Sequence, residues 1–173
     1  MTTKVFITGA SSGIGEALAV YYAARGATLG LAARRGDVLD CLNQRLGGRH
    51  ACYALDVCDA AALHAAANDF MARFGVPDIV IASAGVSAGT LTEHEEDLEI
   101  FRRLMDINVF GMAATFAPFI PAMKNVPAGS SRLVGIASVA GIRGLPGAEA
   151  YSASKAAAID RKSTRLNSSH RIR

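Results

Sequence analysis

The chain has 173 residues, of which 51% are hydrophobic and 19% charged, so it is long and apolar enough for one folded domain and is not disordered by composition. Its net charge of +3 is concentrated at one end, because residues 159–173 hold five basic side chains and one acidic one, which leaves residues 1–158 with a net charge of −1. Because the part of the chain that is expected to fold has no excess of positive charge, a nucleic-acid-binding function is disfavoured.

Two kinds of segment alternate along the first half of the chain. Short runs of β-branched and aromatic residues predict buried strands, and the amphipathic segments between them predict helices. Gly26 is placed to end the first helix, a role that glycine often has at a helix carboxyl end. The predicted strands cover residues 4–8, 28–33 and 51–55, and the predicted helices cover residues 13–25, 37–46 and 60–74.

The second half of the chain continues this alternation. A fourth strand is predicted over residues 78–82, a long helix over 94–123, a fifth strand over 131–137, and another helix starting near Ala150. Such alternation predicts an α/β protein whose parallel sheet is covered by helices on both faces. Right-handed crossovers favour the doubly wound strand order 3-2-1-4-5, and ligands of such sheets bind beyond the carboxyl ends of the strands.

The periodic pattern stops after Ala158, so we expect a domain over residues 1–158 and a solvated tail over residues 159–173. The longest apolar run, residues 109–123, is shorter than the roughly 20 residues that cross a bilayer. The amino terminus shows no secretory signal, and the three cysteines lack the spacing of metal ligands. These features predict a cytoplasmic protein with no metal site and no membrane partner.

Three glycines, Gly9, Gly13 and Gly15, lie between the first predicted strand and the helix that follows it. Glycines at such a turn let the backbone approach a pyrophosphate that rests on the amino end of the helix. The spacing here is G-x-x-x-G-x-G and not the more common G-x-G-x-x-G. For this motif alone, an ordinary glycine-rich turn therefore remains an alternative.

The residues at the ends of the second and third strands bear on the choice of cofactor. Arg34 and Arg35 follow the second strand, and no acidic residue occurs before Asp37. Because an acid at this place holds the ribose of NAD and an arginine suits the 2′-phosphate of NADP, we predict NADP(H), with Arg34 as the phosphate partner and NAD(H) as the alternative. A solvated surface pair is the other interpretation of the arginines. Asp56 can accept a hydrogen bond from the adenine amino group or cap the next helix.

Tyr151 and Lys155 lie one helical turn apart. Tyr151 comes thirteen residues after Ser138, which directly follows the fifth predicted strand. A free tyrosine hydroxyl has a pKa of about 10 and is a poor base at neutral pH. A neighbouring lysine cation favours the phenolate, and the Ser138 hydroxyl can hold a substrate oxygen. A tyrosine and a lysine at this spacing are ordinarily a surface pair, but their place after the fifth strand predicts hydride transfer between a nicotinamide and a carbonyl or alcohol.

Together these motifs resemble the short-chain dehydrogenase/reductase family, in the branch with the spacing T-G-x-x-x-G-x-G, over residues 4–158. The resemblance implies a Rossmann-like doubly wound sheet and an oxidoreductase. It also implies that Ser138, Tyr151 and Lys155 are catalytic, with the tyrosine delivering the proton and the lysine also binding the nicotinamide ribose. Asn108 matches the family's fourth catalytic residue, which carries a water-linked proton relay to the lysine.

The resemblance further implies a set of cofactor contacts. Asp56 and Val57 match the adenine-contacting pair, and residues 82–85 match the family's N-x-A-G turn, although Ser83 stands where asparagine is usual. The implied cofactor-binding residues are Gly9, Ser11, Ser12, Gly13, Ile14, Gly15, Arg34, Asp56, Val57, Ser83, Ala84, Gly85, Tyr151 and Lys155.

The end of the chain departs from the family pattern. After the tyrosine helix the family has another strand, a substrate-covering loop and a final strand, and residues 159–173 match none of these. We therefore expect a truncated chain with a tail that is not native, and a homodimer or tetramer for the full-length protein. Two alternatives to an NADP(H)-dependent enzyme acting on a small carbonyl or alcohol stay open: a non-catalytic nucleotide-binding regulatory protein on the same scaffold, and an inactive fragment.

Overall fold

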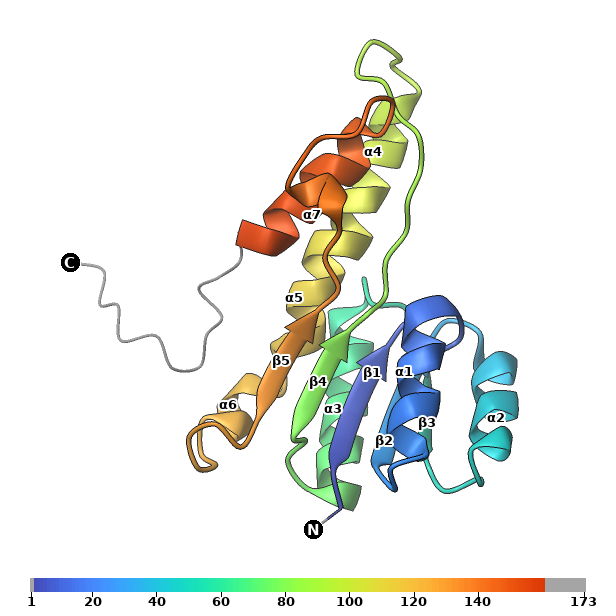
Figure 1. Ribbon diagram of the computed structural model, residues 1–173, viewed down its shortest axis with the longest axis vertical. Helices are drawn as coiled ribbons and strands as arrows, with labels where there is room; N and C mark the ends of the chain where they lie inside the picture. The colour runs from blue at the N-terminus through green and yellow to red at the C-terminus, as the bar shows by residue number, and fades with distance from the viewer. Residues whose placement is uncertain (1, 161–173) are drawn as a thin grey trace, which may run out of the picture.

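A computed structural model describes residues 2–160 of the chain. Five parallel strands form one sheet in the order β3-β2-β1-β4-β5, which confirms the predicted doubly wound α/β fold (Figure 1). The predicted strand bounds agree with the observed ones to within two residues. The strands are β1 (Lys4–Thr8), β2 (Thr28–Ala33), β3 (Ala51–Ala54), β4 (Ile79–Ala82) and β5 (Arg132–Gly135).

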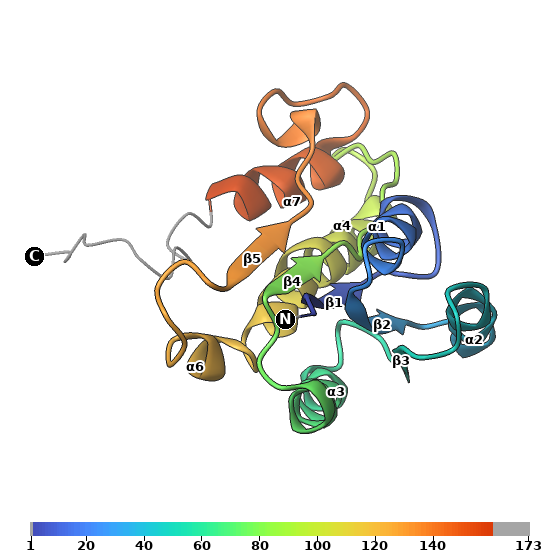
Figure 2. The ribbon, with the colours of Figure 1, turned by 60° about the horizontal axis from the view of Figure 1, so that its bottom comes forward.

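Successive residues of the central strand face opposite sides of the sheet, and each side packs against its own helices. Val5 and Ile7 belong to the apolar cluster that includes α1 (Gly13–Ala23) and α2 (Gly36–Arg45). Phe6 belongs to the cluster under α3 (Ala60–Phe74) and α5 (Gly111–Phe116). Figure 2 shows α1 and α3 on opposite sides of the sheet. The core is thus two apolar layers with the sheet between them.

The predicted long helix over residues 94–123 is wrong as one continuous helix. It consists of α4 (Asp97–Met105), a π-helical turn η1 (Asp106–Phe110), then α5, and the short α6 (Ile120–Met123). Proline has no backbone N–H and clashes with the preceding helical turn, so Pro118 ends α5. The π-helical turn has no comparable signal in the sequence.

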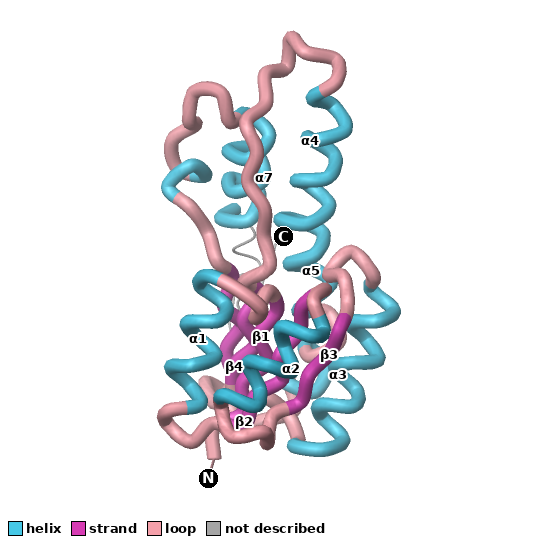
Figure 3. The backbone as a smooth tube through the Cα atoms, turned by 90° about the vertical axis from the view of Figure 1, so that its right-hand side faces the viewer, coloured by secondary structure: helices cyan, strands magenta, loops and turns pink. Residues whose placement is uncertain are grey.

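The last described elements extend beyond the carboxyl ends of the strands. A single 3₁₀ turn η2 (Val139–Gly141) leads to α7 (Glu149–Asp160), which packs beside α4 (Figure 3). Ile159 and Asp160, which were expected to belong to the tail, are the last residues of α7; the rest of the expected tail lies outside the described residues. None of the described helices has the length and apolar character needed to cross a membrane.

Candidate functional site

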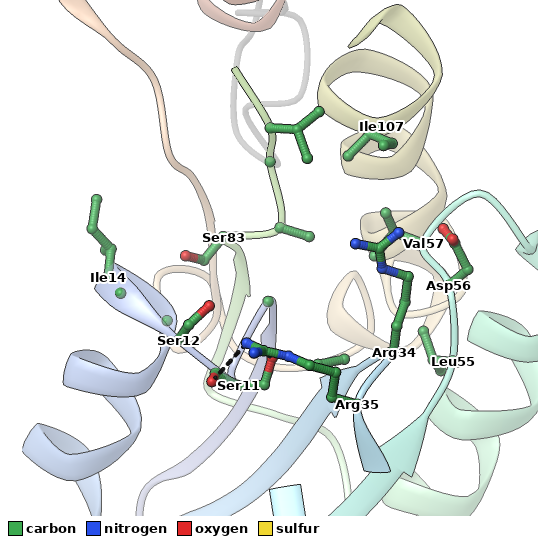
Figure 4. A pocket seen from close by; sticks show the side chains of 17 residues that line it. Ser11, Ser12, Ile14, Arg34, Arg35, Leu55, Asp56, Val57, Ser83 and Ile107 are labelled. Carbon is green, nitrogen blue, oxygen red and sulfur yellow. Dashed lines mark hydrogen bonds between the residues drawn. The ribbon is translucent and has the colours of Figure 1, made fainter. Parts of the chain in front are cut away.

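A cavity of about 390 Å³ lies beyond the carboxyl ends of β1, β2 and β4 (Figure 4). Its walls contain every residue that the sequence predicts to contact a cofactor, apart from Tyr151 and Lys155. These residues are Gly9, Ser11, Ser12, Gly13, Ile14, Gly15, Arg34, Asp56, Val57, Ser83, Ala84 and Gly85. The fold therefore brings four separate turns of the chain to one place, while their binding to a cofactor remains a prediction.

Two glycines of the first turn are needed because the backbone approaches itself closely there. A Cβ atom on Gly15 would lie 2.2 Å from the Gly9 carbonyl oxygen. A Cβ atom on Gly9, where φ is +70°, would lie 2.7 Å from the Ala84 backbone. The Gly9 contact seats the glycine-rich loop against the turn after β4, whereas the Gly15 contact packs the start of α1 against the loop itself. A side chain at Gly9 would push the loop away from the turn, and one at Gly15 would push α1 away from the loop.

The amino end of α1 opens onto this cavity. Ser12 precedes the helix in an extended conformation, and its side chain makes no capping hydrogen bond. The first backbone N–H groups of a helix lack partners within the helix and carry partial positive charge, so they attract anions. The loop can therefore receive a pyrophosphate group.

The two arginines at the end of β2 point in different directions. The Nη2 atom of Arg35 donates to both the carbonyl oxygen and the hydroxyl of Ser11, at 3.1 Å each. Figure 4 shows Arg34 directed toward Val57 and Asp56, on the far side of the cavity. Because Arg35 is engaged by the glycine-rich loop, Arg34 is the more available guanidinium for an anion. Arg35 was not among the predicted site residues, since nothing in the sequence indicates its contact with a residue 24 positions away.

The structure distinguishes between the two roles considered for Asp56, a helix amino cap and a residue at the cofactor site. The amino cap of α3 is Asp59, whose carboxylate accepts a hydrogen bond from the Ala62 backbone at 2.9 Å. The Asp56 carboxylate instead accepts from the Cys58 backbone at 2.9 Å and lies at the cavity wall. Asp56 is therefore not the cap of α3.

The Lys155 ammonium lies beside the cavity, although its side chain comes from α7. The residue is 5% exposed, and its Nζ atom donates to the Ile136 carbonyl oxygen at 2.9 Å. Burial lowers the pKa of this lysine below its ordinary value. A Cβ atom on Gly85 would lie 3.5 Å from Nζ, an ordinary contact distance, which places the lysine next to the cavity wall at Gly85.

Tyr151 and Ser138 are held near this lysine by the contact of α7 with η2. The Lys155 Nζ atom lies 5.8 Å from the centroid of the Tyr151 ring. Ser138 is the amino cap of η2, and its hydroxyl accepts from the Ala140 backbone at 3.2 Å. A Cβ atom on Gly141 would lie 2.5 Å from the Lys155 carbonyl group, so only glycine allows η2 and α7 to meet this closely.

Asn108 is 1% exposed and lies in the π-helical turn η1. Its Nδ2 atom donates to the Val86 carbonyl oxygen and to the Ser154 hydroxyl, each at 2.9 Å. Its Oδ1 atom accepts from the Val86 backbone at 2.9 Å. Asn108 thus connects the segment after β4 with α7. Ser154 and Gly141 were missed by sequence reasoning, because their partners are distant in the chain and neither contact leaves a periodic pattern.

Comparison with known proteins gives one consistent result. The family model described as short chain dehydrogenase matches residues 3–166. The 2-dehydro-3-deoxy-L-rhamnonate dehydrogenase (NAD(+)) of a Sphingomonas species is 40% identical over 153 residues, which is 88% of this chain and 60% of that protein. The sulfoacetaldehyde reductase of Chromohalobacter salexigens is 34% identical, over 90% of this chain and 62% of that protein. The chain therefore spans about three fifths of the length of these two relatives.

Solved structures agree with the sequence comparisons. A short-chain dehydrogenase from Streptomyces avermitilis superposes with a TM-score of 0.85 at 34% identity, covering 93% of this chain and 58% of that one. An alcohol dehydrogenase from the archaeon Thermococcus sibiricus, complexed with 5-hydroxy-NADP, superposes with a TM-score of 0.83 at 30% identity, covering 93% of this chain and 68% of that one.

Proposed function

The chain belongs to the short-chain dehydrogenase family, and on that premise we propose that it is an enzyme that transfers a hydride between NADP(H) and a small carbonyl or alcohol substrate. The observation that carries the proposal is the position of Lys155 beside the cavity that contains the predicted cofactor residues. A nucleotide bound there would extend toward Tyr151, which shares a helical face with the lysine.

The cavity suits a dinucleotide in two respects. The free N–H groups at the start of α1 favour a pyrophosphate, and the glycine-rich loop allows close approach of its backbone. When bound, the nicotinamide supplies or accepts the hydride. In the direction of carbonyl reduction, Tyr151 gives its proton to the substrate oxygen, and in the reverse direction it takes that proton back. The Lys155 ammonium places a positive charge 5.8 Å from the centroid of the Tyr151 ring, and the Ser138 hydroxyl holds the substrate oxygen.

Replacement of the tyrosine hydroxyl tests the catalytic proposal. Tyr151→Phe removes the proton donor and should lower kcat by roughly 10²–10⁴-fold, while the Kd for NADPH stays close to that of the wild-type chain. Turnover is followed by nicotinamide absorbance with a panel of small aldehydes and ketones that includes sulfoacetaldehyde. Tyr53→Phe is the matched control, because the Tyr53 hydroxyl donates to Asp69 on the outer face of α3. If Tyr151→Phe is as active as the wild-type chain, the hydroxyl has no catalytic role.

For the cofactor we propose a preference for NADP(H), with Arg34 as the partner of the 2′-phosphate. Support comes from the two guanidinium groups at the end of β2 and the lack of an acidic residue there. Arg34→Ala should weaken NADPH binding by about 10–100-fold and change NADH binding by less than about twofold. Equal or tighter binding of NADH by the wild-type chain would contradict the preference and favour the NAD(+) named for the Sphingomonas relative.

For the whole protein we propose a homodimer or tetramer in the cytoplasm that acts on small molecules. The support is the family membership together with the net charge of −1 over residues 1–158, which gives no excess of basic residues for a nucleic acid. Light scattering of the full-length protein measures its assembly. A monomeric mass would contradict this part of the proposal and leave the hydride transfer untouched.

A further inference from the structure

Ser154 lies on α7, between Tyr151 and Lys155 in the sequence, and contacts Asn108 of the π-helical turn η1. Its side chain is completely buried. Its hydroxyl donates to the Tyr151 carbonyl oxygen at 2.8 Å and accepts from the Asn108 Nδ2 atom at 2.9 Å. The single hydroxyl proton of Ser154 is used within α7. A lone pair of the same oxygen accepts the hydrogen bond from Asn108 that attaches α7 to the π-helical turn.

The Asn108 amide is fully used by this arrangement. The Val86 N–H can only donate and so takes the Oδ1 atom, while the Val86 carbonyl oxygen takes one of the two Nδ2 protons. The remaining Nδ2 proton goes to Ser154. A continuous chain of hydrogen bonds therefore runs from Val86, at the cavity wall, through Asn108 and Ser154 to the backbone of Tyr151.

We propose that Ser154 is a positioning residue that fixes the Tyr151–Lys155 turn against Asn108 and, through it, against the cofactor cavity. The proposal rests on the proposed function and adds a residue that touches neither substrate nor cofactor. The η2 contact at Gly141 holds the carbonyl group of Lys155, and the Ser154 bond holds the carbonyl group of Tyr151. Between them the two contacts set the distance of the reacting hydroxyl from the cavity.

Loss of the Ser154 hydroxyl leaves a buried N–H of Asn108 without an acceptor. The structure can then satisfy that proton only by moving α7 or by admitting water. A displacement of about 1 Å at a reacting group can lower the rate by about 10²-fold, whereas cofactor affinity depends on the glycine-rich loop and changes little.

The experiment compares kcat and the Kd for NADPH in Ser154→Ala, Asn108→Ala and the double variant of the full chain. Ser154→Ala should lower kcat by about tenfold or more, with the Kd for NADPH within about twofold of the wild type. If Ser154 acts through Asn108, the double variant should be no slower than Asn108→Ala alone. Additive losses of kcat would overturn the proposal.

Thr115→Val is the control for the loss of a buried hydroxyl. Thr115 is also completely buried and also donates to a carbonyl oxygen of its own helix, that of Gly111 at 2.7 Å, but this hydrogen bond involves neither α7 nor a predicted site residue. Thr115→Val should lower the Tm without the selective loss of kcat. An equal loss of kcat in Thr115→Val and Ser154→Ala would reduce the role of Ser154 to stability and overturn the proposal.

A second measurement separates this inference from the proposed function. The Asn108 side-chain amide resonance, assigned by its absence in Asn108→Ala, should shift in Ser154→Ala, because one of its protons loses an acceptor. A resonance that does not move overturns the inference whether or not the chain is active. If the wild-type chain shows no turnover with any carbonyl compound, the proposed function fails and the positioning role fails with it. Wild-type turnover with an unaffected Ser154→Ala overturns the inference alone.

Discussion

The half of the chain that forms most of the cavity (residues 2–78) and the half that carries the proposed catalytic residues (residues 79–160) are stabilised in different ways. In the first half, β1 and β2 are buried almost throughout, between α1 and α2 on one face and α3 on the other. In the second half, β5 is largely exposed. Most of the exposed large apolar side chains also lie there: Leu91, Leu98, Phe110, Val134, Val139, Ile142 and Leu145.

The side chains proposed to be catalytic are correspondingly held by individual contacts more than by the surrounding core. Lys155 is bonded to the Ile136 carbonyl, Asn108 to Val86 and Ser154, and η2 meets α7 at a glycine. From this difference we expect substitutions in the two halves to change different properties of the protein. Those in the glycine-rich loop of the first half should affect cofactor binding and stability together, and those at the contact of η2 with α7 in the second half should affect turnover while the cofactor still binds.

The largest effect is expected from Gly15→Ala in the first half. The new methyl group would lie 2.2 Å from the Gly9 carbonyl oxygen, and because that neighbour is backbone, the whole loop must move. NADPH binding should weaken by about 100-fold or more, with a lower Tm. Gly13→Ala is the control: its φ of +57° costs about 1–2 kcal/mol of strain, but no atom lies within 4 Å of the added methyl group. Titration calorimetry measures the affinity for NADPH. An affinity of Gly15→Ala equal to that of the wild type would contradict the expectation that substitutions in the glycine-rich loop of the first half weaken cofactor binding.

The second effect in size is expected from Gly141→Ala. Its methyl group would meet the Lys155 carbonyl group at 2.5 Å and push η2 away from α7. We expect kcat to fall by about tenfold or more and NADPH affinity to change by less than about twofold. Gly144→Ala, three residues later and with no atom within 4 Å of its added methyl group, should retain its activity. Loss of NADPH affinity in Gly141→Ala would show that the two halves are not separable.

The smallest effect concerns a residue of the first half that is far from the site. His50, just before β3, accepts a hydrogen bond from the Leu29 backbone through Nδ1 at 3.3 Å, so it is neutral in the folded chain. Burial, with the nearby Arg49 charge, lowers the pKa of this histidine below its ordinary value of 6.5. The unfolded chain therefore binds the proton more readily, and stability should decrease as the pH falls below 6.5 toward the folded-state pKa.

His50→Asn tests this prediction, because its Oδ1 atom can accept from Leu29 at the position of Nδ1. The loss of unfolding free energy between about pH 7.5 and about pH 5.5 should be smaller in the variant, by at most about 1.4 kcal/mol, because pH 5.5 lies about one unit below the ordinary pKa of histidine. Urea unfolding at both pH values measures it, and the affinity for NADPH should not change. An identical pH dependence in variant and wild type would exclude His50 as the source.

The sequence predicts well the fold and the residues that line the cavity, for a physical reason. Strands such as residues 4–8 are buried on both faces, so their composition alone indicates them, and Gly9 and Gly15 are required by close backbone contacts. The second half is less predictable because its contacts join distant residues. Asn108 reaches Ser154 across 46 positions, and the π-helical turn that contains Asn108 interrupts a segment with an uninterrupted helical pattern. Only the family resemblance assigned a role to Asn108.

The π-helical turn also changes which partner each part of the interrupted helix faces. An α-helix advances about 100° per residue, so one wider turn rotates everything after it relative to everything before it. With η1 in place, α4 packs against α7, while α5 packs against β4 and α3. Deleting a single residue from Asp106–Phe110 would restore a regular helix and rotate Met112 and Phe116 out of phase with the sheet. The number of residues in this one turn therefore determines which side chains of α5 face the sheet.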